Sequence, residues 1–409
     1  MLMMLVPLFD DSMAVKAYSI FSQKDNYFLN PMKLGTSRLD GAGMIEGLEL
    51  IEIMGIETLS DDKEIFVPVN NISIFSDVEE QCKAPCARIV FLLDNTILPN
   101  EMYVERLKVL KEKGYKLAIR KLAVSDFENY REVLKLVDYV FLNNKKIAID
   151  KAKVYFGKLY PQIKLCAGNI DTVATYEELK VAGGYQLYEG PFYRVPVTRG
   201  DNKIAPLKIN YIELLNVVND ENYELHDAAD IIGRDPALTI SLLKMVNRMS
   251  VNSGITTIRH AAAMLGQREL RKWINTAVVN ELYADKPNEI TRLSLLRAKF
   301  AEKLAASFGM KGFADELFLM GLFSVLDVTL EMPMADALAL VKVSDNIREA
   351  LLHKTGKFAA VYDMMEQYEN ANWAEVSRQL IVNDMELAGV SEAYHTALRW
   401  YKELTSGRK

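Results

Sequence analysis

Cysteine and histidine side chains are the first candidates for chemistry in this sequence, because they bind metals and serve as nucleophiles or bases. The chain has 409 residues but only 3 cysteines and 4 histidines. Cys82 and Cys86 lie four positions apart, a spacing seen in metal and redox pairs, yet no two further soft ligands lie near them in the sequence. The histidines are scattered, and His260 has no recognisable base and orienting acid to accompany it. A zinc enzyme is therefore not expected.

The first half of the chain has the pattern of strand and helix units around a parallel sheet. Short apolar runs rich in β-branched residues alternate with amphipathic stretches up to about residue 195. The number of units suits a (β/α) barrel as well as an open sheet. The expected strands are Met4–Phe9, Ile65–Val69, Arg88–Leu93, Lys116–Ile119, Tyr139–Leu142 and Lys164–Cys166.

The second half has a different pattern, with apolar residues recurring at helical spacing. Prolines and glycines between residues 190 and 206 mark the change. Asp235 followed by Pro236 is typical of a helix N-terminus, and apolar residues follow at a period of 3.6. We therefore predict an α/β domain over residues 1–195, a linker over 196–206 and an all-α domain over 207–409.

Composition and charge limit the function classes. Hydrophobic residues make up 50% and charged residues 25% of the chain, which is typical of a folded globular protein. The net charge of −6 gives no electrostatic footprint for nucleic acid or an anionic membrane. The apolar stretch 1–9 lacks the basic residues and length of a signal peptide, and the longest other uncharged run, 317–326, is about half a membrane span. We expect a cytoplasmic protein.

Several short motifs of the second half resemble the HDOD family of helical regulatory domains. They begin with Asp235–Leu238 and continue through Leu242–Leu243 and Asn247. They end with Ile258, Ala262, Leu265–Gly266 and Trp273, in the order and spacing of the family.

Motifs of the first half, taken in order, resemble the EAL family of cyclic di-GMP phosphodiesterases. The matching segments are Val69–Ser73, Gly114–Ala118, Asp138–Val140, Ala182–Gly184 and Glu189–Pro191 with Pro196. The two resemblances imply a TIM-like (β/α) barrel followed by a multi-helix HDOD domain.

The EAL resemblance also implies where a metal site would lie. Such an enzyme holds one or two divalent metals on carboxylates at strand ends, where the metal generates a hydroxide and neutralises the phosphate. In this chain only Asp94 and Asp171 keep a carboxylate near the matching positions, and Glu189 stands where the family has glutamine. The other positions are degenerate: Ser19, Phe91, Arg120, Lys121, Phe141, Asn143 and Gly168. The resemblance therefore implies no catalytic residue and no metal ligand.

Arg120 and Lys121 replace the central pair of aspartates implied by the resemblance. Two unit charges about 4 Å apart interact by roughly 4 kcal/mol at an effective dielectric of 20, and a divalent ion doubles that repulsion. Three interpretations stay open for the basic pair. In the first, Arg120 or Lys121 forms a charge pair with Asp94 or Asp171 that replaces the metal; in the second, the basic side chains point into solvent; in the third, they hold a phosphate without cutting it.

The helical half has its own missing chemistry. HDOD domains resemble metal-dependent HD phosphohydrolases, whose His–Asp pair would fall within residues 321–327. The chain has Ser324–Val325 there, and we interpret the nearby Asp327 as a structural residue at a helix end. No metal is expected in this half either.

The double resemblance implies a bacterial signal-transduction protein, in which an inactive EAL-type domain is coupled to an HDOD protein-interaction or output domain. Two alternatives remain: an active cyclic di-GMP phosphodiesterase that requires magnesium or manganese, and a sensor that binds cyclic di-GMP without hydrolysis. No cofactor is expected otherwise, the signalling partner is unnamed, and a homodimer is left open. The candidate ligand-binding residues are Asn71, Asp94, Arg120, Lys121, Asp171, Glu189 and Arg194.

Overall fold

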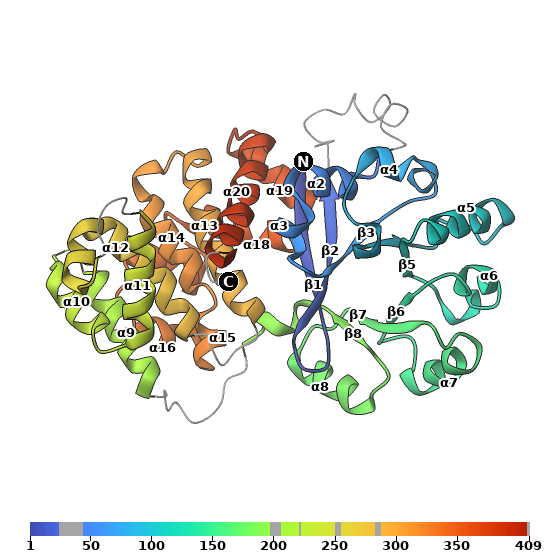
Figure 1. Cartoon of the computed structure of the whole chain (residues 1–409), viewed down its shortest axis with the longest axis horizontal. Helices are drawn as coiled ribbons and strands as arrows, with labels where there is room; N and C mark the ends of the chain where they lie inside the picture. Colours follow the sequence, from blue (N-terminus) through green and yellow to red (C-terminus); the bar gives the residue numbers. More distant parts are fainter. Residues whose placement is uncertain (24–43, 197–205, 221, 250–254, 283–287, 407–409) are drawn as a thin grey trace. The chain divides into compact units, whose positions relative to one another are not determined.

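The computed structural model of the chain describes residues 1–23, 44–196, 206–220, 222–249, 255–282 and 288–406. It divides into two compact units. Unit 1 comprises residues 1–195, 306–309 and 364–409, and unit 2 comprises residues 196–305 and 310–363. Each unit has its own fold and its own buried core (Figure 1).

Unit 1 contains a closed barrel of eight strands, which confirms the predicted fold class for the first half. Strands β2 to β8 pair in parallel in sequence order, whereas β1 runs antiparallel to both β2 and β8 and closes the barrel. The strands are β1 (Leu2–Phe9), β2 (Val15–Gln23), β3 (Glu64–Pro68), β4 (Ile89–Leu93), β5 (Lys116–Ile119), β6 (Tyr139–Asn143), β7 (Lys164–Gly168) and β8 (Leu187–Glu189).

Two of these strands, β2 and β8, are absent from the strands expected from sequence. Strand β2 mixes Lys16, Ser19 and Ser22 with apolar residues, and β8 has only three residues, so neither stands out as an apolar run. Pairing partners on both sides stabilise them in the closed sheet. Asp10 stabilises the hairpin between β1 and β2, because its carboxylate accepts hydrogen bonds from the backbone amides of Ser12 and Ala14.

Helices of unit 1 follow the strands, as expected for strand and helix units (Figure 1). Side-chain caps begin several of them: Asp77 caps α4, Asn100 caps α5 and Thr172 caps α8. The helices are α2 (Glu46–Met54), α3 (Ile56–Ser60), α4 (Val78–Gln81), α5 (Glu101–Glu112), α6 (Arg131–Leu134), α7 (Ile149–Leu159) and α8 (Val173–Ala182).

The barrel interior is filled with side chains, so it is a packed core and not a pore. Alternate residues of each strand point inward, in keeping with the two-residue period of a β-strand. The inward set contains Leu8, Ala17, Phe66, Val90, Leu92, Ala118, Tyr139, Phe141, Cys166 and Leu187, each at most 6% exposed. This alternation fixes which residue of each strand reaches the carboxyl-terminal end of the barrel, called the mouth below.

Unit 2 is helical throughout its described residues, which confirms the predicted all-α pattern. The Asp235 carboxylate accepts hydrogen bonds from the amides of Ala237 and Leu238, as predicted for an N-cap. The helices are α9 (Pro206–Val218), α10 (Leu225–Ile232), α11 (Pro236–Met249), α12 (Ile258–Leu282), α13 (Asn288–Ser307), α14 (Ala314–Phe323), α15 (Leu326–Leu330), α16 (Met334–Ala339) and α17 (Asp345–His353).

The end of the chain differs from the expected domain division. The prediction assigned all of 207–409 to the helical domain, but residues 364–409 belong to unit 1 together with the barrel. This segment holds the second half of α18 (Ala359–Glu369), then α19 (Trp373–Val382) and α20 (Leu387–Ser406). Helical periodicity predicts a buried face for such helices but does not say what buries it. The expected linker 196–206 lies almost entirely outside the described residues.

Candidate functional site

The mouth of the barrel gathers residues from five strand ends. Ala118, Phe141, Cys166 and Leu187 point inward, so the residues two positions further along their strands point into the mouth. These residues are Arg120, Asn143, Gly168 and Glu189, and the same rule on β4 brings in Asp94. The structure therefore brings together most of the residues that the sequence singled out.

Arg120 is the central side chain of the mouth. Its Nη2 atom donates to both carboxylate oxygens of Glu189, at 2.9 and 2.7 Å. The guanidinium carbon also lies 5.6 Å from the ring centroid of Phe21 and 5.1 Å from that of Phe141. The side chains of Arg120 and Glu189 are only 20% and 12% exposed. Charge pairing and cation–π attraction thus hold the arginine in place, and the charges of Arg120 and Glu189 are both partly shielded from water.

Lys121 and Asp94 form a second charge pair at the rim. The Lys121 ammonium lies 3.1 Å from Oδ2 of Asp94, while Thr96 donates its amide and hydroxyl to Oδ1. Burial by itself would raise the pKa of Asp94, but the hydrogen bonds from Thr96 and Lys121 outweigh it and lower that pKa. Lys121 thus pairs with Asp94, as one of the three interpretations held, whereas Arg120 pairs with Glu189 instead.

Ser19 and Phe91 occupy very different places. Ser19 follows Ala17 on the inward face of β2 and is fully buried, and its hydroxyl has no hydrogen-bond partner among the described residues. Phe91 lies between the inward residues Val90 and Leu92 and therefore points out of the barrel, where its ring contacts Tyr115 at 4.9 Å. The structure thus does not bring Phe91 to the mouth, because a strand alternates its faces residue by residue.

The remaining candidates are engaged in local structure. The Asn143 side chain accepts from the amide of Lys145, and the Gly168 carbonyl accepts from Asn144. Asp171 is 60% exposed and pairs with Lys145 at 2.6 Å. The carbonyl of Asn71 accepts from the Tyr103 hydroxyl.

Arg194 is directed to the C-terminal segment. Its guanidinium lies 3.2 Å from the Glu369 carboxylate and 2.6 Å from Oδ1 of Asn370. Arg194 therefore holds two parts of unit 1 together. This role could not be predicted from the sequence, because 175 positions separate Arg194 from Glu369.

The residues of the mouth do not fit a divalent metal. Glu189 and Asp94 are each paired with a basic side chain. Ser19, Asn143 and Gly168 offer no carboxylate. Among the described residues, no group of three histidine, cysteine, aspartate or glutamate side chains could hold a metal ion. Magnesium requires several oxygen ligands in near-octahedral array, and a guanidinium at the centre of the mouth opposes it.

Sequence reasoning missed two contacts that shape the mouth. The Arg120–Glu189 pair joins residues 69 positions apart, and the Phe21 ring comes from β2, a strand that was not predicted. A signal existed in the sequence: relative to the pattern that the resemblance implies, the basic Arg120 replaces an aspartate and the acidic Glu189 replaces a neutral glutamine. A basic residue and an acidic residue that both appear at strand ends of one barrel are candidates for a pair.

The expected position of the HD pair in unit 2 is a tightly packed helix crossing. A Cβ atom added to Gly321 would come within 2.4 Å of the Arg297 backbone, so only glycine lets α14 approach α13 this closely. Arg297, 7% exposed, donates to the carbonyl and hydroxyl oxygens of Ser324 at 3.3 and 3.1 Å. Burial raises the pKa of the nearby Asp327. This region is a packed core with an arginine inside it.

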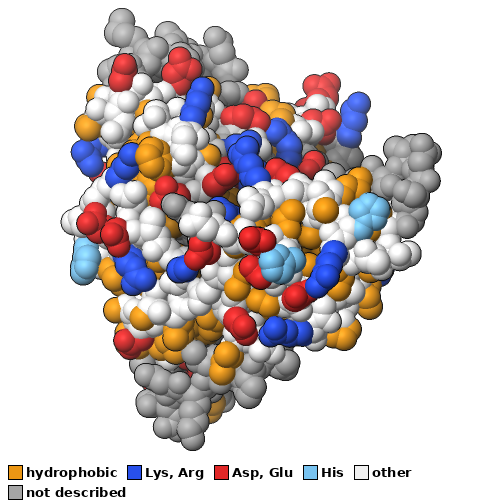
Figure 2. Space-filling model, turned by 90° about the vertical axis from the view of Figure 1, so that its left-hand side faces the viewer, with side chains coloured by type: hydrophobic (Ala, Val, Ile, Leu, Met, Phe, Trp, Pro, Cys, Tyr) orange, Lys and Arg blue, Asp and Glu red, His pale blue; other side chains and the backbone are white. Residues whose placement is uncertain are grey.

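The surface of the molecule gives a further constraint. Figure 2 shows one face, on which Lys and Arg side chains are interspersed with Asp and Glu, and no extended basic area is visible among its described side chains. None of the described helices is long and apolar enough to cross a membrane.

Comparison with known proteins finds a family match within the second half of the chain. Residues 204–341 match the model of the HDOD domain. The cyclic di-GMP phosphodiesterase CdgJ of Vibrio cholerae is 26% identical over 325 residues, which cover 78% of this chain and 74% of that protein. The Bacillus subtilis protein YuxH is 27% identical over 365 residues, covering 87% of this chain and 88% of that protein.

Solved structures of EAL proteins are similar to slightly less than half of the chain, at a low level. The manganese and cyclic di-GMP complex of Klebsiella pneumoniae BlrP1 gives a TM-score of 0.38 at 12% identity, covering 47% of this chain and 55% of that chain. The EAL domain of Mycobacterium smegmatis DcpA gives 0.33 at 14% identity, covering 46% of this chain and 89% of that chain. Residues 204–341 thus match the HDOD family model, and they follow a closed barrel of eight strands, the fold class that was expected for the first half.

Proposed function

We propose that this chain is a regulatory protein of cyclic di-GMP signalling whose barrel does not hydrolyse the nucleotide. One observation carries the proposal: Arg120, held by Glu189 between Phe21 and Phe141, occupies the centre of the mouth. The name of the relative CdgJ supports the signalling class, and the replaced carboxylates argue against its activity in this chain.

The helical HDOD domain is the output module in this proposal. It acts by binding a signalling protein, and the barrel acts as the regulatory half. We propose domain limits of 1–195 for the barrel and 207–363 for the helical module. Residues 364–409 are assigned to the barrel domain, with which they form one compact unit.

A hydrolysis assay tests the proposal directly. The full chain is incubated with cyclic di-GMP and magnesium or manganese, and the linear dinucleotide is quantified by chromatography. No metal-dependent product is expected, and turnover above a no-protein blank would contradict the proposal. The variant Arg120→Ala tests whether Arg120 alone blocks an otherwise competent site. We expect this variant to remain inactive, because Ser19, Asn143 and Gly168 still provide no metal ligand.

A second candidate function is a sensor that binds cyclic di-GMP without cutting it. The Lys121 side chain, 63% exposed at the rim, favours this alternative because its ammonium is accessible to a phosphate group. Titration calorimetry with and without magnesium distinguishes the candidates. Heat that is lost in Lys121→Ala but kept in Lys158→Ala, a lysine of α7 remote in sequence from the strand ends, indicates a sensor, and no heat indicates a protein scaffold.

A further inference from the structure

The helical unit is inserted into the barrel unit along the chain. The chain leaves unit 1 at Val195 and returns to it at Met364. The return falls within one continuous helix, α18 (Ala359–Glu369), whose first five residues belong to unit 2 and whose last six belong to unit 1. Val361, on the first part of α18, is fully buried. The two parts of α18 therefore belong to one hydrogen-bonded helix.

The second part of α18 is fixed to the barrel at two points. Glu369 and the adjoining Asn370 bind Arg194, the residue directly before the chain leaves the barrel. Tyr368, which is fully buried, accepts a hydrogen bond on its hydroxyl from the backbone amide of Met3 at 3.2 Å. The helix end thus contacts both the exit segment and strand β1.

Strand β1 needs such a partner. Within the described residues its register pairs it with β2 along its whole length but with β8 only at Leu8 and Phe9. The remaining edge would expose unpaired amides and carbonyls, which is a hazard for an apolar strand. Instead Leu2, Met3 and Leu5 are fully buried. The Met3–Tyr368 hydrogen bond satisfies one amide of this edge.

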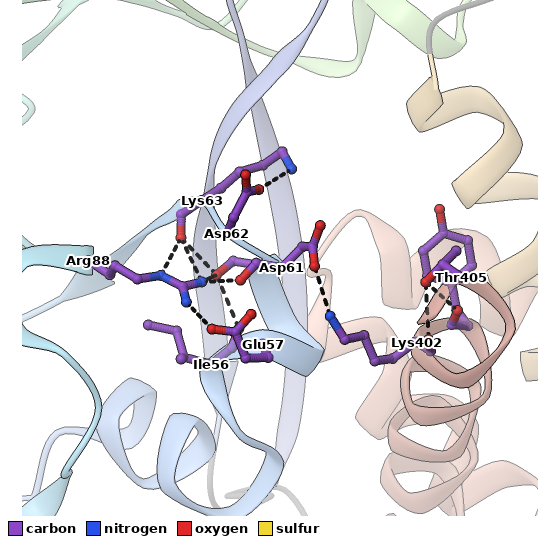
Figure 3. Close-up of polar contacts among 10 residues, drawn as sticks. Ile56, Glu57, Asp61, Asp62, Lys63, Arg88, Lys402 and Thr405 are labelled. Carbon is purple, nitrogen blue, oxygen red and sulfur yellow. Dashed lines mark hydrogen bonds and ion pairs between the residues drawn. The ribbon is translucent and has the colours of Figure 1, made fainter. Parts of the chain in front are cut away.

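Helix α20 holds the same strand and an adjoining helix. The Tyr394 hydroxyl lies 3.2 Å from the sulfur of Met4, and its ring packs 4.8 Å from that of Tyr368. Figure 3 shows the other end of this helix, where Lys402 pairs with Asp61 at 2.8 Å. Arg88, directly before β4, donates to the Asp61 carbonyl and pairs with Glu57. The segment is therefore anchored on strand β1 and on the turn that follows α3.

The hairpin leads straight to the mouth. Met4, which contacts Tyr394, is the register partner of Phe21 on β2. The Phe21 ring lies against the guanidinium of Arg120. A continuous set of contacts thus runs from Tyr368 through Tyr394, Met4 and Phe21 to Arg120.

We propose that the C-terminal segment, residues 364–409, couples the state of the helical domain to Arg120 in the barrel mouth. A displacement of α18 alters the Tyr368 and Tyr394 contacts on β1, and the paired strand β2 moves Phe21 against Arg120. The coupling rests on the proposed function only in treating the mouth as a regulatory site. Because it concerns motion within the chain, its test needs no nucleotide, and turnover in the hydrolysis assay would leave it standing.

Hydrogen exchange read by mass spectrometry on the full chain tests the coupling. Val361→Ala perturbs the part of α18 in the helical unit, and Tyr368→Phe removes the hydroxyl that binds Met3. Each single variant is expected to raise the exchange rate in Leu2–Phe9 and Val15–Gln23 about threefold, because opening of these strands becomes easier. The double variant is expected to exchange no faster than the faster single variant, since both changes act on one path.

Val246→Ala, a fully buried valine of α11 in unit 2, is the matched control and should leave both strands unchanged. Two results would overturn the coupling: no change in β1 and β2 with Val361→Ala, or effects of the two variants that multiply as independent changes do. Tyr368→Phe keeps the ring and its packing, so the test remains valid if Val361→Ala fails to fold. In that case unchanged exchange at β1 in Tyr368→Phe overturns the proposal by itself.

Discussion

The barrel mouth and the α13–α14 crossing of the helical domain each hold an arginine where a resembled enzyme family has its metal chemistry. In the mouth, Arg120 faces a carboxylate directly and retains partial access to solvent. At the crossing, Arg297 donates to the carbonyl and hydroxyl of Ser324 and is almost fully buried. An arginine thus forms a charge pair at a partly exposed site in the barrel, whereas another arginine is part of the buried core in the helical domain.

The difference teaches which of these two regions can respond to a change in the surroundings of the protein. A pair at a solvent edge can be opened by a ligand or by movement of its neighbours, at modest cost. A guanidinium enclosed by a helix crossing can be released only by disrupting the core, because Gly321 leaves no space between the helices. We therefore expect regulation at the mouth and structural stability at the crossing.

The largest expected effect is loss of the buried arginine. Arg297→Ala leaves the oxygens of Ser324 without this donor and Asp327 without its nearby positive charge. We expect the free energy of unfolding to fall by about 3 kcal/mol, as when one member of a buried charged network is removed. Chemical denaturation followed by circular dichroism measures it, with the exposed Arg378→Ala as control. A loss below that of Arg120→Ala would contradict the comparison.

Replacing the arginine of the mouth is expected to lower the free energy of unfolding by less than replacing Arg297. Arg120→Ala leaves Glu189 partly buried without its partner, and we expect a loss of about 1 to 2 kcal/mol. Adding Glu189→Gln should recover part of this loss, because the unpaired charge is removed as well. A double-mutant cycle by the same denaturation method measures the recovery, and strictly additive losses would show that the two groups do not interact.

Two serines give a matched pair of smaller effects with opposite sign. Ser19→Ala removes a buried hydroxyl that has no hydrogen-bond partner, so we expect a gain in stability of up to about 1 kcal/mol. Ser324→Ala removes a hydroxyl that donates to Gly321 and accepts from Arg297, so a loss of about 1 kcal/mol or more is expected. Thermal denaturation reads both, and a loss in Ser19→Ala would mean that its hydroxyl is satisfied in solution.

The smallest expected effects are opposite dependences on pH. The pKa of Asp327 is raised by burial, so its contribution to stability is present in acid and is lost as the pH rises through its folded-state pKa. The pKa of Asp94 is lowered, so its contribution is present above the unfolded value of 3.8 and is lost as the pH falls through the folded value.

From acid to neutral pH, Asp94→Asn should therefore become less favourable relative to the native chain as the pH rises to 3.8, and Asp327→Asn should become more favourable as the pH rises above that value. Denaturation curves across this range measure both. Parallel slopes for the two variants would mean that the mouth and the crossing do not differ in how they solvate a carboxylate.

Much of the barrel could be predicted from the sequence, because buried strands leave a strong local pattern. Strand β5 was predicted with its observed bounds, and five others to within a few residues. Strand β2 could not, since its polar residues break the apolar run and its neighbours in the sheet stabilise it. The Asp235 cap was predictable because it acts within three residues.

The sequence by itself determined that the mouth has lost most of the expected carboxylates, since residue identity at strand ends decides which ligands exist. Only the tertiary structure decided that Arg120 pairs with Glu189, that Phe91 points away, and that residues 364–409 belong with the barrel. Chemical identity is a local property of the chain. Pairing and burial depend on which distant segments meet when the sheet closes, and one-dimensional patterns do not specify those contacts.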